Sequence, residues 1–209
     1  AVFIAVAKGD IPRESWFRLG RKLTTYRGYR TLLSWSGTMF EYLMPSLFLR
    51  DFEDSLLAES AAGAVRIQQS YARARGVPWG ISEAAHSERD VQLNYQYRAF
   101  GVPVLGLGVK ADDLVIAPYA SVLALMVDPI RATSNLKHMT SREWRGRYGF
   151  FEAVDYTGAR PEVVRAYMIH HQGMALLALA NTLLDNTIQR LFHSNPLVLA
   201  TELLLQERL

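Results

Sequence analysis

The chain has 209 residues, half of them apolar, which is enough to bury a sizeable core in one domain or part of one and excludes a disordered chain. Its 23 basic and 20 acidic residues leave a net charge of only +3, and the scattering of Lys and Arg along the sequence argues against nucleic acid as a partner. The absence of cysteine excludes disulfides, thiol catalysis and thiolate metal sites.

The two ends of the sequence favour a piece of a longer protein. The chain begins at Ala1-Val2-Phe3 without a methionine and ends inside a helical pattern at residues 205–209. The first ten residues lack the long apolar stretch of a signal peptide, and no apolar run reaches the roughly 20 residues of a membrane span. We therefore expect any membrane attachment to lie outside this chain.

Helical periodicity dominates the sequence in chain order. Apolar and small residues of 54–75 recur at spacings of three and four, and Gly76-Val77-Pro78 ends the pattern. Proline opens several of the other helical segments, which suits a first helical position. The predicted helices cover residues 12–25, 38–49, 54–75, 117–127, 129–139, 161–184, 186–192 and 196–208.

Few segments resemble strands. Alternation of apolar residues near 102–109 is interrupted by Pro103 and three glycines, at 101, 106 and 108, which favours a loop or a short hairpin. The sequence therefore predicts an all-α fold of helical hairpins. The connection from Arg75 to Leu114 is long for a helical bundle, and long ordered loops are usually functional.

Two acidic residues stand in short aromatic loops punctuated by glycine. Glu83 follows Trp79-Gly80, and Glu152 follows Phe150-Phe151. Aromatic rings stack on sugar faces while a carboxylic acid protonates a glycosidic oxygen, so carbohydrate is the favoured substrate class. The structural alternative for both residues is a helical first turn, where an acid is favoured by the helix dipole.

Other polar residues support the same class of ligand. Glu41 lies in a nearly continuous apolar run, which indicates either a site role or a buried salt bridge to an arginine. Adjacent histidines cannot share one helical face, so His170 and His171 argue against a metal site; one would face the core and the other a polar pocket. Tyr95, Tyr97 and Tyr119 add rings and hydroxyls that suit an uncharged, polyhydroxylated ligand.

The motifs strongly resemble the glucoamylase-like domain of bacterial cyclic β-1,2-glucan synthases, over nearly the whole chain. The resemblance rests on residues 37–45, 95–103 and 117–120 and on Pro78-Trp79-Gly80-Ile81-Ser82-Glu83, Gly149-Phe150-Phe151-Glu152-Ala153 and His170-His171-Gln172-Gly173-Met174. It implies that residues 1–209 form about half of an (α/α)6 barrel, its C-terminal half, with aromatic, glycine-rich loops at one end. It further implies a very large synthase at the cytoplasmic face of the bacterial inner membrane, with glycosyltransferase and phosphorylase-like domains as partners.

The resemblance also implies a reaction that needs no cofactor. The domain would cut linear β-1,2-glucan internally and rejoin the ends as a ring, which requires a retaining pair of carboxylates about 5–5.5 Å apart. The sequence favours Glu83 as nucleophile and Glu152 as acid/base, and Glu41 or Asp155 can replace either. Substrate-binding candidates are Trp35, Trp79, Tyr95, Tyr97, Tyr119, Tyr156, His170, His171 and Gln172.

Three alternatives remain open at this level. The domain can be a binding module that grips the growing glucan while another domain does the chemistry, or a helical scaffold that binds no oligosaccharide. A simple β-1,2-glucan hydrolase would use the same carboxylates as a transglycosylase.

Overall fold

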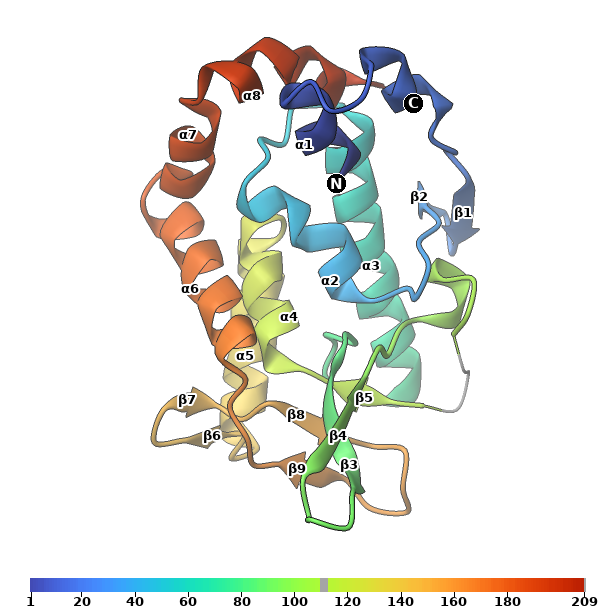
Figure 1. Cartoon of the computed structure of the whole chain (residues 1–209). Coiled ribbons are helices and arrows are strands. Elements are labelled where there is room, and N and C mark those ends of the chain that lie inside the picture. The colour runs from blue at the N-terminus through green and yellow to red at the C-terminus, as the bar shows by residue number, and fades with distance from the viewer. Residues whose placement is uncertain (110–112, 209) are drawn as a thin grey trace.

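Helices form most of the molecule and small antiparallel sheets gather at one end (Figure 1). The structure is a computed structural model that describes residues 1–109 and 113–208. Within that part, the α-helices are α1 (Val2–Ala7), α2 (Met39–Leu43), α3 (Leu56–Arg75), α4 (Pro118–Leu123), α5 (Pro129–Ser141), α6 (Ile169–Leu183), α7 (Thr187–His193) and α8 (Pro196–Thr201). Short 3-10 helices are η1 (Arg13–Arg18), η2 (Pro45–Leu47), η3 (Pro103–Leu105), η4 (Ala124–Met126) and η5 (Glu202–Gln206).

The expectation of an all-α fold is wrong in one respect, because 48% of the chain is helical and 17% lies in strands. The strands are β1 (Leu23–Tyr26), β2 (Tyr29–Leu32), β3 (Ala84–Arg89), β4 (Tyr95–Arg98), β5 (Val115–Ile116), β6 (Arg145–Gly146), β7 (Gly149–Phe150), β8 (Ala153–Asp155) and β9 (Glu162–Val164). They pair as β1-β2, β3-β4, β6-β7 and a three-stranded sheet in the order β5-β8-β9.

Helix α3 has the capping chemistry that its sequence predicts. The Ser55 side chain accepts a hydrogen bond from the Ala58 N–H at the start, and Gly76 ends the helix in the left-handed conformation with φ 67°. No helix in the described residues is long and apolar enough to cross a membrane.

Two predicted helices are partly strands. Residues 12–25 form η1 and then β1, because Arg27-Gly28 adopts the positive φ angles of 49° and 85° that a tight hairpin turn needs. The helix predicted from 161 begins only at Ile169. The β-branched pair Val163-Val164 instead extends a sheet as β9, paired with β8.

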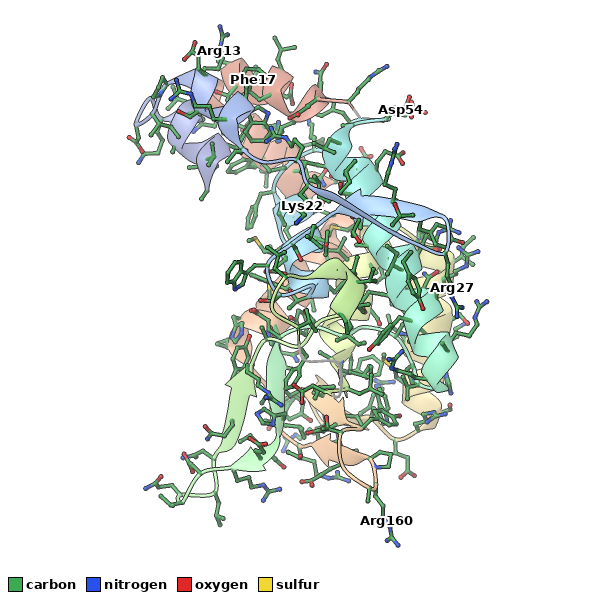
Figure 2. All side chains as sticks on the ribbon, turned by 90° about the vertical axis from the view of Figure 1, so that its right-hand side faces the viewer. Arg13, Phe17, Lys22, Arg27, Asp54 and Arg160 are labelled. Carbon is green, nitrogen blue, oxygen red and sulfur yellow. The ribbon has the colours of Figure 1, made fainter. Side chains whose placement is uncertain are left out.

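The main apolar core lies between α2, α3, α4 and the β5-β8-β9 sheet, and α6 packs on α4. A second, smaller cluster lies at the opposite end, near both termini, and includes Phe3, Trp16 and Leu205. There Arg21 and the Trp16 indole both bond the carboxylate of Glu207, which ties η1 to the C-terminal segment. Figure 2 shows labelled basic side chains from Arg13 at this end to Arg160 at the other.

Candidate active site

Each of the two predicted glutamates stands directly before a strand. Glu83 precedes β3, so the helix start expected around it is wrong, and Glu152 precedes β8. The loop before β3 is fixed by Gln68 of α3, which is fully buried and bonds both the N–H (2.8 Å) and the carbonyl (2.7 Å) of Ile81. The Glu152 N–H donates to the Ala166 carbonyl at 3.0 Å. Both backbones are therefore held rigidly.

Glu152 is a buried carboxylate with only 2% of its surface exposed. Its Oε1 accepts a hydrogen bond from the Ala85 N–H at 3.2 Å and lies 2.8 Å from His171 Nδ1. Because Ala85 belongs to β3, the strand that follows Glu83 itself touches Glu152. The fold thus brings together two loops that are far apart in the sequence.

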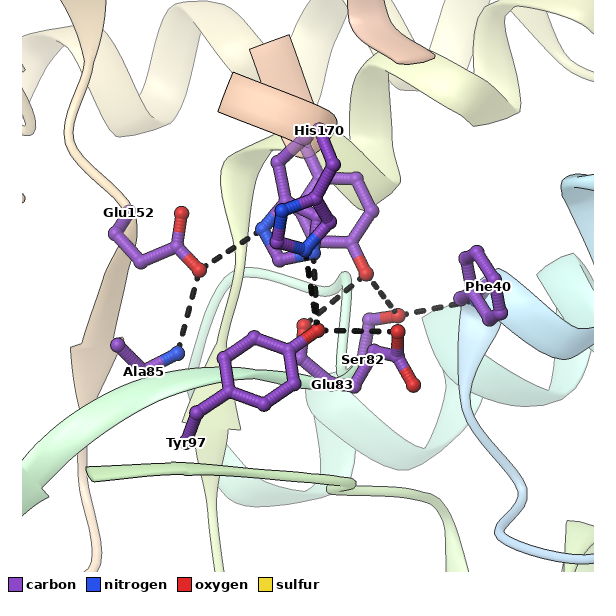
Figure 3. A network of polar contacts seen from close by, with 9 residues as sticks. Phe40, Ser82, Glu83, Ala85, Tyr97, Glu152 and His170 are labelled. Atoms are coloured by element: carbon purple, nitrogen blue, oxygen red, sulfur yellow. Dashed lines mark hydrogen bonds and ion pairs between the residues drawn. The ribbon is translucent and has the colours of Figure 1, made fainter. Parts of the chain in front are cut away.

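Tyr97 of β4 links Glu83 to two histidines through one hydroxyl (Figure 3). The hydroxyl donates to Glu83 Oε1 at 3.0 Å and lies 3.3 Å from His171 Nε2 and 3.4 Å from His170 Nε2. Since His171 also contacts Glu152, an unbroken series of polar contacts runs from Glu83 through Tyr97 and His171 to Glu152. We call these four residues the carboxylate chain.

Tyr119 of α4 contacts two members of the carboxylate chain, His171 and Glu83. Its ring stacks on the His171 imidazole with centroids 3.7 Å apart. Its hydroxyl lies 2.8 Å from Ser82 Oγ and donates to the Glu83 carbonyl at 3.1 Å. Ser82 Oγ in turn accepts from the Phe40 N–H of α2 at 3.0 Å. Helices α2 and α4 therefore both contact the loop that carries Glu83.

The surroundings within the site shift the pKa values of three side chains, Tyr97, Tyr119 and His170. Burial, reinforced by the charge of Glu83, raises the pKa of Tyr97 and of Tyr119 above the ordinary tyrosine range, so both hydroxyls stay protonated. Burial, with the neighbouring His171, lowers the pKa of His170 below its ordinary value, against the opposing charges of Glu152 and Glu83. These groups therefore act as neutral hydrogen-bonding partners near pH 7.

The two other acidic candidates are engaged elsewhere. The Glu41 carboxylate closes a capping box with Thr38 and accepts from Ser36 N–H and the Ser34 hydroxyl, where a salt bridge to arginine was the expected alternative. Asp155 accepts from the N–H and hydroxyl of Ser87, which clasps β8 to β3. The hydrogen bonds of Glu41 therefore stabilise the loop before α2, and those of Asp155 stabilise the contact between two strands.

The remaining predicted substrate-binding residues lie in different surroundings. Trp79 is only 8% exposed and borders a cavity of about 350 Å³ whose lining includes neither Glu83 nor Glu152. The Tyr95 hydroxyl accepts from Arg89, and the Tyr156 hydroxyl accepts from Arg142. Trp35 is 72% exposed on the loop before α2. Gln172 lies half-buried in the first turn of α6.

Sequence reasoning missed two participants, Ser82 and the Ala85 N–H. The only signal for Ser82 was its position beside Glu83, and an alanine backbone gives none. In the described part of the chain, no group of three or more His, Asp or Glu side chains is arranged to hold a metal ion. A separate cavity of about 890 Å³ lies near the termini, between α1, η1 and η5, and contains neither glutamate of the pair.

Comparison with known proteins gives a family and a fold. A family model described as "Putative glucoamylase" matches residues 2–196. The chain is 46% identical over 212 aligned residues to the cyclic beta-(1,2)-glucan synthase NdvB of Rhizobium meliloti, a match that covers 98% of this chain and 8% of that protein. The chain therefore spans less than a tenth of this curated relative.

Two solved structures resemble the whole chain at low sequence identity. A "putative glucoamylase" from Bacteroides caccae matches with a TM-score of 0.74 and 18% identity. The endo-β-1,2-glucanase of Chitinophaga pinensis, in complex with sophorotriose and glucose, matches with a TM-score of 0.70 and 20% identity. Each match covers 98% of this chain and 52% of the solved chain. The solved neighbours are of the helical toroid type, and this chain matches about half of each. The family model and the 46% identical relative establish that the chain belongs to the glucoamylase-like family.

Proposed function

We propose that this domain cleaves linear β-1,2-glucan and rejoins the cut ends by retaining transglycosylation, with Glu83 and Glu152 as its two carboxylates. The observation that carries the proposal is the carboxylate chain, which links one half-buried and one buried glutamate through Tyr97 and His171. The two carboxylates of a retaining enzyme have different roles, which different surroundings support. The substrate class is supported by NdvB and by the Chitinophaga glucanase.

The hydrogen bonds favour the opposite order of roles from the one that the sequence suggested. A backbone N–H can only donate, so Glu152 Oε1, which receives the Ala85 N–H, is held as an acceptor. An acceptor oxygen in a fixed position suits a nucleophile. Glu83 is less buried and contacts a hydroxyl, which can both donate and accept a proton. We therefore assign Glu152 as nucleophile and Glu83 as acid/base.

The reaction follows from these roles in two steps. Glu152 attacks the anomeric carbon while Glu83 gives its proton to the departing glycosidic oxygen, which leaves a glycosyl ester on Glu152. A hydroxyl at the other end of the glucan then attacks the anomeric carbon as Glu83 removes its proton, and the bond from that carbon to the Glu152 carboxylate breaks. The new glycosidic bond closes the ring, and both carboxylates return to their starting forms.

Hydrolysis is the second candidate, favoured by the likeness to an endo-β-1,2-glucanase. Water would replace the sugar hydroxyl in the second step with the same two glutamates. The products separate the two reactions, because transglycosylation gives rings whereas hydrolysis gives shorter linear chains. In the longer protein, we propose that other domains supply the linear glucan.

The test is to incubate the complete polypeptide that carries this chain with linear β-1,2-glucan and to separate cyclic from linear products. We expect Glu83→Gln and Glu152→Gln each to abolish both cleavage and cyclisation. Glu88→Gln is the matched control on β3, because its side chain is 73% exposed and its carboxylate lies 3.9 Å from His86, which is not part of the carboxylate chain, so activity should be unchanged. Full activity in either site variant would refute the assignment, and unimpaired glucan binding without any turnover in the unmodified protein would favour a binding module.

A further inference from the structure

The single hydroxyl proton of Tyr97 has three candidate acceptors, of which His170 Nε2, at 3.4 Å, is the farthest. Glu83 Oε1 lies 3.0 Å from the hydroxyl oxygen and His171 Nε2 lies 3.3 Å from it. A phenol carries only one proton, so it can donate to one of them at a time. The direction of that bond therefore depends on which neighbour already carries a proton.

The state of His171 is set from its other side. Its Nδ1 lies 2.8 Å from Glu152 Oε1, and the ionised carboxylate of the proposed nucleophile can only accept, so Nδ1 is the donor to that oxygen. In a neutral imidazole the remaining nitrogen, Nε2, is then an acceptor. The imidazole cannot turn, because it is fully buried and stacked on Tyr119. His171 thus offers Tyr97 a fixed acceptor.

These contacts define two complementary arrangements. When Glu83 carries its proton, it donates to the Tyr97 oxygen and Tyr97 donates to His171 Nε2. When Glu83 has lost its proton, Tyr97 turns its hydroxyl and donates to the Glu83 carboxylate. No proton is gained or lost by Tyr97 in this change, and only the hydroxyl rotates.

We propose that Tyr97 is the positioning residue of the acid/base, its hydroxyl turning between His171 and Glu83 as Glu83 gives up and regains its proton. The inference rests on the proposed function, in which Glu83 protonates the leaving oxygen and later deprotonates the acceptor. Tyr97 holds the Glu83 carboxyl group in one place through both steps. It also connects the protonation state of Glu83 to His171, the residue that contacts the nucleophile Glu152.

The test is the pH dependence of kcat/KM for Tyr97→Phe in the complete polypeptide, on linear β-1,2-glucan. The alkaline limb of this profile reports the proton on the acid/base. A hydrogen bond to a charged acceptor is roughly twice as strong as one between neutral groups, so losing the hydroxyl should favour the protonated form and move the alkaline limb up by about one pH unit. The titratable groups that face Glu83 and Tyr97 are Tyr119, Glu152, His170 and His171.

Tyr119→Phe is the control, because it removes a neighbouring tyrosine hydroxyl that contacts only Ser82 Oγ and the Glu83 main chain. We expect Tyr97→Phe to lose about tenfold in kcat with its alkaline limb displaced, and Tyr119→Phe to keep the limb of the unmodified protein. Equal limbs in Tyr97→Phe and the unmodified protein, with Glu83→Gln inactive, would overturn this inference alone. A fully active Glu83→Gln would overturn both the inference and the proposed function.

Discussion

Replacing Gln68 by methionine should damage the site from a distance. The Gln68 amide is fully buried and bonds the Ile81 N–H at 2.8 Å and the Ile81 carbonyl at 2.7 Å, two residues before Glu83. Methionine keeps the length and volume of the side chain but leaves both backbone groups buried without a partner. At about 1–3 kcal/mol for each such group, the local free energy of unfolding should fall by about 2–6 kcal/mol.

The neighbouring glutamine provides the matched control. Gln69 makes a longer bond of 3.3 Å from its Nε2 to Oδ2 of Asp128, the N-cap of α5. Its replacement by methionine should cost only about 0.5–1.5 kcal/mol. Both variants replace a glutamine by a methionine, at neighbouring positions of α3.

Two measurements in the complete polypeptide decide this prediction. Hydrogen exchange of the peptide that spans residues 76–85 should quicken strongly in Gln68→Met and only slightly in Gln69→Met. Turnover of β-1,2-glucan should fall by about 10- to 100-fold in Gln68→Met, because a displacement of the order of 1 Å at a catalytic group has effects of this size. Unchanged exchange and turnover in Gln68→Met would refute the view that α3 positions Glu83.

Two further predictions concern stability. Gly63→Ala should destabilise the packing of α3 on β2 by about 1–3 kcal/mol, because the new Cβ would lie 2.2 Å from the Arg30 carbonyl oxygen. Gly173→Ala meets nothing within 4 Å and should stabilise α6 by about 0.5–1 kcal/mol. Thermal inactivation midpoints of the two variants that move in the same direction would contradict this. Burial alone would raise the pKa of Asp155, but hydrogen bonds from Thr157 and Ser87 outweigh it and lower the pKa. The ionised carboxylate therefore stabilises the fold fully above the unfolded pKa of about 3.9, and this stabilisation is lost as pH falls through the lower folded value. Asp155→Asn should therefore be less stable than the unmodified protein at pH 7, and the difference in inactivation temperature should shrink below about pH 4; a difference that does not depend on pH would refute this.

The long helices could be predicted because their signals are local. The apolar stripe of α3, its Ser55 cap and the Gly76 stop all lie within the segment that they define. The strands could not be predicted in the same way. Strands β5, β8 and β9 have only two or three residues each, too few for alternation to register, and their pairing depends on partners distant in the sequence.

The acidic candidates could be proposed from their loops, but their arrangement could not. Glu83 and Glu152 were chosen because each stands beside aromatic residues, and this property is visible in the sequence. The contact of Glu152 with the Ala85 N–H depends on β3 lying beside the loop before β8, and no residue type marks it. Glu41 has the same composition of neighbours, yet its carboxylate caps α2, because a capping box and a catalytic loop share the same residue types.

The proposed reaction places a glycosyl ester on Glu152. The most direct measurement treats the Glu83→Gln variant of the complete polypeptide with a β-1,2-glucooligosaccharyl β-fluoride, whose fluoride leaves without an acid, and maps the labelled peptide by mass spectrometry. We predict that a glycosyl group accumulates on Glu152, because the variant lacks the base needed for the second step. A label on another residue, or release of a product of inverted configuration without any labelled protein, would contradict the account.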